Sequence, residues 1–69
     1  MPLTMAKIGE KNAIKKVSGK EHTRQFLNNL GFVPGSHVTV ITETSGNVIV
    51  GIKESRIAIS REMAAKIIV

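Results

Sequence analysis

The amino-acid sequence predicts a small, mainly β domain whose strands suit a closed barrel. The chain has 69 residues, which is enough for one domain, residues 1–69, with one core. Valine and isoleucine dominate its apolar residues, and β-branched side chains favour strands over helices. The β-branched runs are short and are separated by glycines and polar turns. Closing these strands into a barrel would pair the two edge strands that a flat sheet of this size leaves exposed.

The composition excludes several classes of protein. There is no cysteine, so disulfides and thiolate metal sites are excluded. No run approaches the roughly 18 apolar residues needed to span a bilayer. The first six residues lack the charged and long apolar regions of a signal peptide. We therefore expect a cytoplasmic protein.

Positive charge is concentrated in the first third of the chain. Residues 1–24 carry six basic side chains and two acidic ones, which gives +4 of the formal net charge of +5. This distribution indicates an acidic protein surface, nucleic acid or a membrane face as partner. The alternative is a solvated face that keeps a small protein soluble.

A strand followed by a helix is predicted in the first half. Residues 12–17 form the first strand, and the odd spacing of Ile14 and Val17 indicates a bulge or an early strand end. The tetrapeptide Ser18-Gly19-Lys20-Glu21 matches the S-x-x-E capping box that opens helices.

The helix is expected over residues 21–30. Its apolar stripe at helical spacing consists of Thr23, Phe26, Leu27 and Leu30. Gly31 stands where helices end on a left-handed residue, and Val33-Pro34-Gly35 prevents any continuation.

The second half predicts a hairpin, a further strand, a short helix and a last strand. Two β-branched runs, 38–42 and 48–52, flank a glycine turn and predict a hairpin. Residues 56–59 form the next strand. Ser60 caps a short helix from Arg61 to about Lys66. Residues 67–69 form the last strand, which closes the barrel by pairing back onto the first strand.

The helix and the turn after it resemble a known family. The resemblance rests on Gly19, on the segment from Arg24 to Val38 with its Leu30-Gly31-Phe32 centre and second glycine Gly35, and on Ile57-Ala58-Ile59-Ser60 before Ala64. Met1-Pro2-Leu3, Gly9, Ile67 and Val69 also fit it. This pattern is similar to that of the FeoA family, and the resemblance covers essentially the whole chain.

The resemblance implies a specific fold and function. It implies an SH3-like five-stranded barrel with one inserted helix and a short C-terminal helix. Standalone members are cytoplasmic, non-enzymatic accessories of bacterial ferrous iron uptake, and they are thought to act on the transporter FeoB, which has a cytosolic GTP-binding domain. The family label is transition-metal binding, and the same module occurs in iron-dependent repressors, so a metal-sensing regulatory domain is an alternative.

The residues themselves predict neither a metal site nor catalysis. The two histidines, His22 and His37, lack second ligands at helical spacing except Glu21 beside His22, whereas a buried iron or zinc site needs three or four converging donors. The five glutamates are scattered, and there is no phosphate-binding loop or nucleophile motif. We expect no enzyme activity and no cofactor.

Nucleic acid is the second alternative partner. Small basic β-barrels bind RNA and single-stranded DNA, but such sites usually include exposed aromatic side chains for base stacking. The chain has only two aromatic residues, Phe26 and Phe32, and we expect both in the core. Charge alone would give salt-sensitive, unspecific binding.

Recognition of a protein partner is the preferred interpretation. The predicted partner-binding residues are Lys15, Lys16, Lys20 and Arg24, which cluster around the first strand and the helix start. Arg24 could alternatively form an ion pair with Glu21 at i, i+3. The apolar hairpin 38–52 is a third candidate surface, for docking or self-association. We expect a monomer or a weak homo-oligomer.

Overall fold

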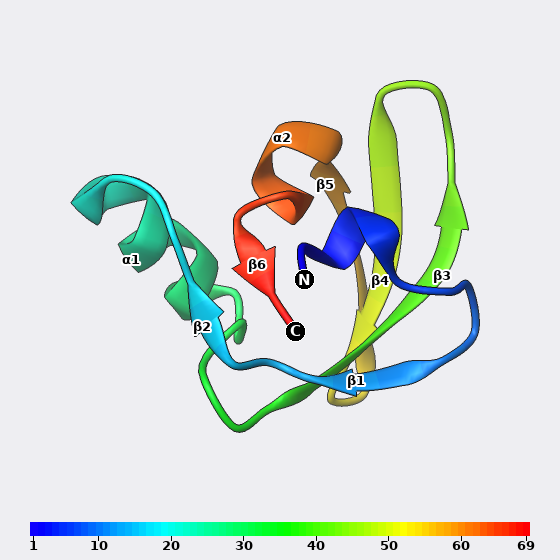
Figure 1. Cartoon of the computed structure of the whole chain (residues 1–69), viewed down its shortest axis with the longest axis horizontal. Coiled ribbons are helices and arrows are strands. Elements are labelled where there is room, and N and C mark those ends of the chain that lie inside the picture. The colour runs from blue at the N-terminus through cyan, green and yellow to red at the C-terminus, as the bar shows by residue number, and fades with distance from the viewer.

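The computed structural model describes residues 1–69 as six strands, two α-helices and one 3-10 turn. Three of the strands are long, and these follow one another directly in the chain (Figure 1). In chain order the elements are η1 (Leu3–Met5), β1 (Lys11–Ala13), β2 (Lys16–Val17), α1 (Glu21–Asn29), β3 (His37–Glu43), β4 (Asn47–Ile52), β5 (Ser55–Ser60), α2 (Arg61–Ala64) and β6 (Ile67–Ile68).

The strands form two antiparallel sheets. The larger sheet has the order β1-β3-β4-β5, and the smaller one pairs β2 with β6. The predicted hairpin is confirmed as β3 and β4, with a register shift between Val40 and Thr42 that leaves Ile41 as the bulged residue. The domain is therefore mainly β, as predicted.

The predicted first strand is in fact two strands that belong to different sheets. The change of sheet occurs at Ile14, whose N–H donates to the Ser36 carbonyl (2.8 Å) and whose carbonyl accepts from Gly35 N–H (2.9 Å). The next N–H, that of Lys15, donates instead to the Ile68 carbonyl (2.8 Å). The Ile14 side chain is buried, so the chain changes sheets around a core residue. Six strands rather than the expected five result.

The predicted closure of the barrel is wrong, although the last strand does return to the predicted first strand. β6 pairs with β2, with Lys16 opposite Ile68 and Val17 opposite Ile67. It does not pair with β5, whose only hydrogen-bonded neighbour is β4. The reason is α2, which follows β5 directly and redirects the chain, as Figure 1 shows.

Helix α1 spans Glu21–Asn29, so it begins at the predicted residue and stops one residue before the predicted end, with Leu30 as its C-cap. Gly31 has φ +108°. The Gly31 N–H donates to the Asn28 carbonyl and the Phe32 N–H donates to the Leu27 carbonyl, both at 3.0 Å. This pair of hydrogen bonds is that of a Schellman cap.

The predicted capping box does not form at the start of α1. The N-cap residue is Lys20, without a side-chain hydrogen bond. The hydroxyl of Ser18 donates instead to the Lys66 carbonyl (3.1 Å), alongside the bond from its own N–H (2.7 Å). Ser18 therefore ties β2 to the start of β6 and does not cap the helix.

The second helix follows its predicted cap. The Ser60 hydroxyl accepts from Met63 N–H at 3.2 Å, and Glu62 lies in the first turn. The α-helix itself stops at Ala64, two residues before the expected end.

The core consists of 14 apolar residues, drawn from both sheets, both helices and the segments between them. Strands β3, β4 and β5 contribute Val38, Val40, Val48, Val50, Ile52 and Ile59 on one face. Phe32 is fully buried, as expected, whereas Phe26 is 49% exposed. The expectation that Phe26 belongs to the core is therefore wrong.

Candidate partner-binding surface

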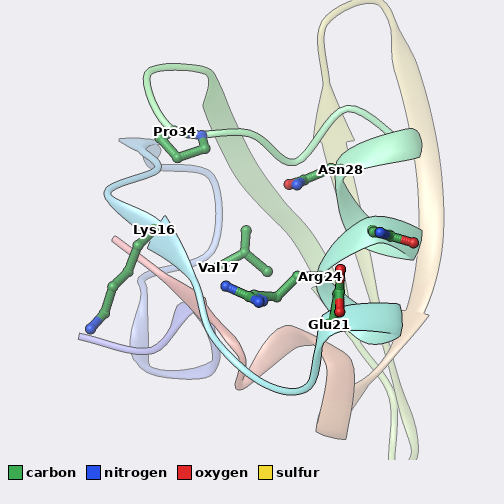
Figure 2. Close-up of a pocket in the computed structure, with 7 residues that line it drawn as sticks. Lys16, Val17, Glu21, Arg24, Asn28 and Pro34 are labelled. Carbon is green, nitrogen blue, oxygen red and sulfur yellow. The ribbon is translucent and has the colours of Figure 1, made fainter.

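A groove of about 370 Å³ lies between β2, α1 and the turn that precedes β3. It is lined by Lys16, Val17, Glu21, Arg24, Gln25, Asn28 and Pro34. Figure 2 shows Val17 between the strand and the helix, with Arg24 and Asn28 on the helix side and Pro34 at the far end. Only two of these residues, Val17 and Pro34, are apolar, so the groove presents mainly polar and charged side chains.

The helix contributes the polar wall because of its periodicity. Positions 21, 24, 25 and 28 follow the i, i+3, i+4, i+7 pattern of one helical face. The opposite face packs inward with Thr23 and Leu27 buried and Leu30 half-buried. The same helix that completes the core thus supplies the wall of the groove.

Arg24 is an unpaired cation in this groove. In Figure 2 its side chain points from α1 toward Val17, with the guanidinium at the end farther from Glu21. The ion pair with Glu21 that the spacing allowed does not form, since the one ion pair of the structure joins Arg61 to Glu43 at 3.6 Å. The donors of the guanidinium are therefore available to a ligand, and such a planar fork matches carboxylate geometry.

The structure brings two of the four predicted partner-binding residues together. Lys16 and Arg24 line the groove, from opposite walls. Lys15 and Lys20 are exposed but lie outside it. Lys15 lies where the chain changes sheets, and Lys20 occupies the N-cap position of α1 without a side-chain hydrogen bond.

The rest of the lining and the exposure of one aromatic residue were not predicted from the sequence. Gln25 and Asn28 were detectable, because they share the helical face of Arg24. Phe26 was not detectable, because its spacing from Thr23 and Leu30 fits the apolar stripe equally well. Three large apolar residues of the N-terminal segment are also more than half exposed, namely Met1, Met5 and Ile8.

The hairpin offers no strong alternative surface. None of the large exposed apolar residues belongs to it. Ile41 and Ile49, on its outer face, are half-buried.

The histidines do not form a metal centre. His22 lies on α1 and His37 begins β3, and no group of three histidine or carboxylate side chains comes together anywhere in the molecule. The residues present therefore do not fit the metal site that the family label implies.

None of the helices is long and apolar enough to cross a membrane.

These features define a small SH3-like β domain with a polar groove between a strand and a helix. Similar proteins identify the family to which it belongs. The family model of the FeoA domain matches residues 1–69. The chain is 41% identical, over 99% of its length and 83% of the relative, to the "Putative Fe(2+) transport protein A" of Methanocaldococcus jannaschii. The chain belongs to the FeoA family, whose proteins are associated with ferrous iron transport.

Solved structures share the fold. The crystal structure of an iron uptake regulatory protein, FeoA, superposes with a TM-score of 0.88 at 25% identity, over 97% of this chain and 91% of the other. FeoA of Stenotrophomonas maltophilia, a prokaryotic SH3 domain protein crystallised with zinc, superposes with a TM-score of 0.85 at 19% identity. The match covers 99% of this chain and 87% of the other. At the latter identity the likeness shows the fold alone.

Proposed function

We propose that this protein is a cytoplasmic, non-enzymatic accessory of ferrous iron uptake that binds and modulates the transporter, an FeoB-like protein, through its cytosolic GTP-binding domain. The docking surface includes the groove between β2 and α1, with Lys16 and Arg24 as its charged walls and Lys15 and Lys20 beside it. Family membership supports the role in ferrous iron transport. The partner and the surface are our inference.

The unpaired guanidinium of Arg24 carries this proposal. Lys16 and Arg24 face a single carboxylate, Glu21, in the groove, and Lys15 and Lys20 lie beside it, so the neighbourhood attracts an acidic partner surface. Gln25 and Asn28 add amide donors and acceptors beside Arg24.

The experiment compares two ligands for one labelled protein. Amide shifts are followed on adding the transporter's cytosolic domain and, separately, an unstructured RNA, both at about 150 mM salt. We expect localised shifts at residues 15–28 with the protein domain, and small, diffuse shifts with RNA. Strong shifts with RNA and none with the transporter domain would replace this function with nucleic-acid binding.

A matched pair of variants tests the role of Arg24. Arg24→Gln removes the guanidinium from the groove, and Lys7→Gln removes one charge from an exposed residue outside it. We expect Arg24→Gln to weaken binding of the transporter domain by about fivefold or more. Lys7→Gln should weaken it by less than about twofold, because an exposed charge outside the docking surface contributes little. Equal losses in the two variants would show that only total charge matters.

A further inference from the structure

A second hollow, of about 390 Å³, lies on the outer face of the four-stranded sheet. It is lined by Lys11, Ser36, His37, Thr39, Gly51 and Lys53. The sheet register explains the position. Thr39 pairs with Lys11 on one side and with Gly51 on the other. The sequence neighbours of Thr39 and Gly51 are buried, and alternate residues of a strand face opposite sides.

Gly51 contributes only backbone to the floor of this hollow, because it has no side chain. A Cβ atom at position 51 would lie only 3.3 Å from Ile41 Cδ1. The bulged residue Ile41 therefore leans over a position without a side chain. The resulting depression is bordered by polar groups from β1, β3 and the turn between β4 and β5.

The hollow is lined by cations and hydrogen-bond donors and by no carboxylate. Lys11 and Lys53 carry ammonium groups, and the His37 ring has an N–H donor in either protonation state. Ser36 and Thr39 add hydroxyl donors. None of these side chains takes part in an ion pair or a side-chain hydrogen bond within the protein. The next residue in the cross-strand row, opposite Gly51, is Arg56, a further cation.

Lys53 occupies a backbone conformation that normally selects glycine. It is the only residue other than glycine with a positive φ, +54°, and it begins the two-residue turn between the paired residues Ile52 and Ser55. The favoured two-residue hairpin turns have positive φ at their first position, which glycine, asparagine or aspartate adopts at lower steric cost. The turn therefore carries backbone strain and places an ammonium group at the hollow.

We propose that this hollow is a binding site for a phosphate-class oxyanion, either free phosphate or the phosphate of a larger ligand. A tetrahedral dianion has enough acceptor oxygens to engage two ammonium groups and the hydroxyls of Ser36 and Thr39 together. A divalent cation is disfavoured, because the lining is positive and has no carboxylate. Nothing in this site depends on the groove between β2 and α1.

The test is an amide-shift titration of the whole protein with inorganic phosphate, at fixed pH and at constant ionic strength set with sodium chloride. We expect saturable shifts at residues 36–39 and 51–53. Shifts no larger than those produced by chloride would overturn the proposal. So would shifts spread equally over the basic residues outside the hollow, namely Lys15, Lys16, Lys20 and Arg24.

Three variants separate a site from a general charge effect. Lys53→Gly removes one cation and relieves the positive-φ strain, so the affinity for phosphate should fall by about three- to tenfold while the melting temperature stays equal or rises. Gly51→Ala keeps all charges but fills the floor, and affinity should also fall. Lys7→Gln, the control outside the hollow, should change affinity by less than about 1.5-fold. Equal losses in Lys53→Gly and Lys7→Gln would exclude a defined site.

Pyrophosphate and a nucleoside triphosphate distinguish the two sources of the oxyanion. If the hollow takes free oxyanions, all three ligands should shift only the lining residues. If it takes the phosphate of a larger ligand, the nucleotide should bind at least several-fold more tightly and add shifts at Ile41 and Ile49, the half-buried residues beside the hollow. Both results support an oxyanion site, whereas binding of none of the three would overturn it.

Discussion

The two phenylalanines of the chain lie in opposite environments. Phe32 is fully buried, and Phe26 is 49% exposed. We expect Phe32→Ala to lower the free energy of unfolding by about 3–5 kcal/mol, and Phe26→Ala by less than about 1 kcal/mol. Thermal melts resolve this difference, because 1 kcal/mol shifts the Tm of a domain of this size by about 4–8 °C. Phe32→Leu is the milder variant if Phe32→Ala does not fold. Equal destabilisation by the two alanine variants would place Phe26 in the core.

At the scale of single residues, sequence reasoning succeeds where the cause is local. Gly31 was predicted because a helix end needs a left-handed residue within one turn. Phe26 was misplaced because its burial depends on how α1 rotates against the sheets, which no local pattern determines. The buried positions Thr23 and Leu27, with half-buried Leu30, already complete the inward stripe at i, i+4, i+7. Phe26 is left at its edge.

At the scale of elements, the cap of α1 can be tested with two glycines. Gly31→Ala places a side chain at φ +108°, and should lower the free energy of unfolding by about 1 kcal/mol or more. A Cβ atom at position 31 would meet only the Ile52 side chain, at 3.7 Å, so the loss comes from the backbone. Gly46→Ala is the control, since nothing lies within 4 Å of a Cβ there and its φ is not positive. It should be neutral or slightly stabilising. Chemical denaturation measures both, and an unchanged Gly31→Ala would contradict the role of Gly31 as a cap.

The elements that sequence reasoning misread are those fixed by distant partners. Residues 12–17 read as one strand, but Ile14 bonds to the turn at Gly35 and Ser36, whereas Lys15 bonds to Ile68. The split therefore depends on residues that are 21 or more positions away in the chain. Ser18 matches a capping box, yet its hydroxyl bonds to the Lys66 carbonyl. Local capping and a long-range bond compete for one hydroxyl, and packing decides between them.

In the molecule as a whole, the N-terminal and C-terminal residues lie side by side. Pro2 forms an isolated antiparallel bridge with Ile68, and the backbone N–H of Val69 donates to the Met1 carbonyl at 2.7 Å. β6 is thus covered on one side by β2 and on the other by the N-terminal residues. The sequence predicted that the last strand needs a partner, because an open edge is a liability. It did not predict that the N-terminal segment provides the second partner.

The charge on the proposed docking surface can be reversed without changing the core. Reversing three positions of the proposed docking surface, with Lys15→Glu, Lys16→Glu and Arg24→Glu, changes the formal charge by six. All three side chains are exposed, so the fold should persist and the Tm should shift little. Charges of this kind mainly steer association. The association rate with the transporter's cytosolic domain should therefore fall by about tenfold at low salt, and its dependence on salt should flatten.

A second triple variant with the same charge change provides the control. Lys7→Glu, Lys53→Glu and Arg56→Glu are all exposed and lie outside the groove between β2 and α1. If docking uses the surface around Arg24, this control should retain most of the association rate at about 150 mM salt, where the field of distant charges is screened within about 8 Å, and the two variants are compared at that salt concentration. Stopped-flow measurements at several salt concentrations compare the two variants. Equal losses in both would mean that the transporter domain senses the net charge of the molecule, and the docking surface would have to be sought elsewhere.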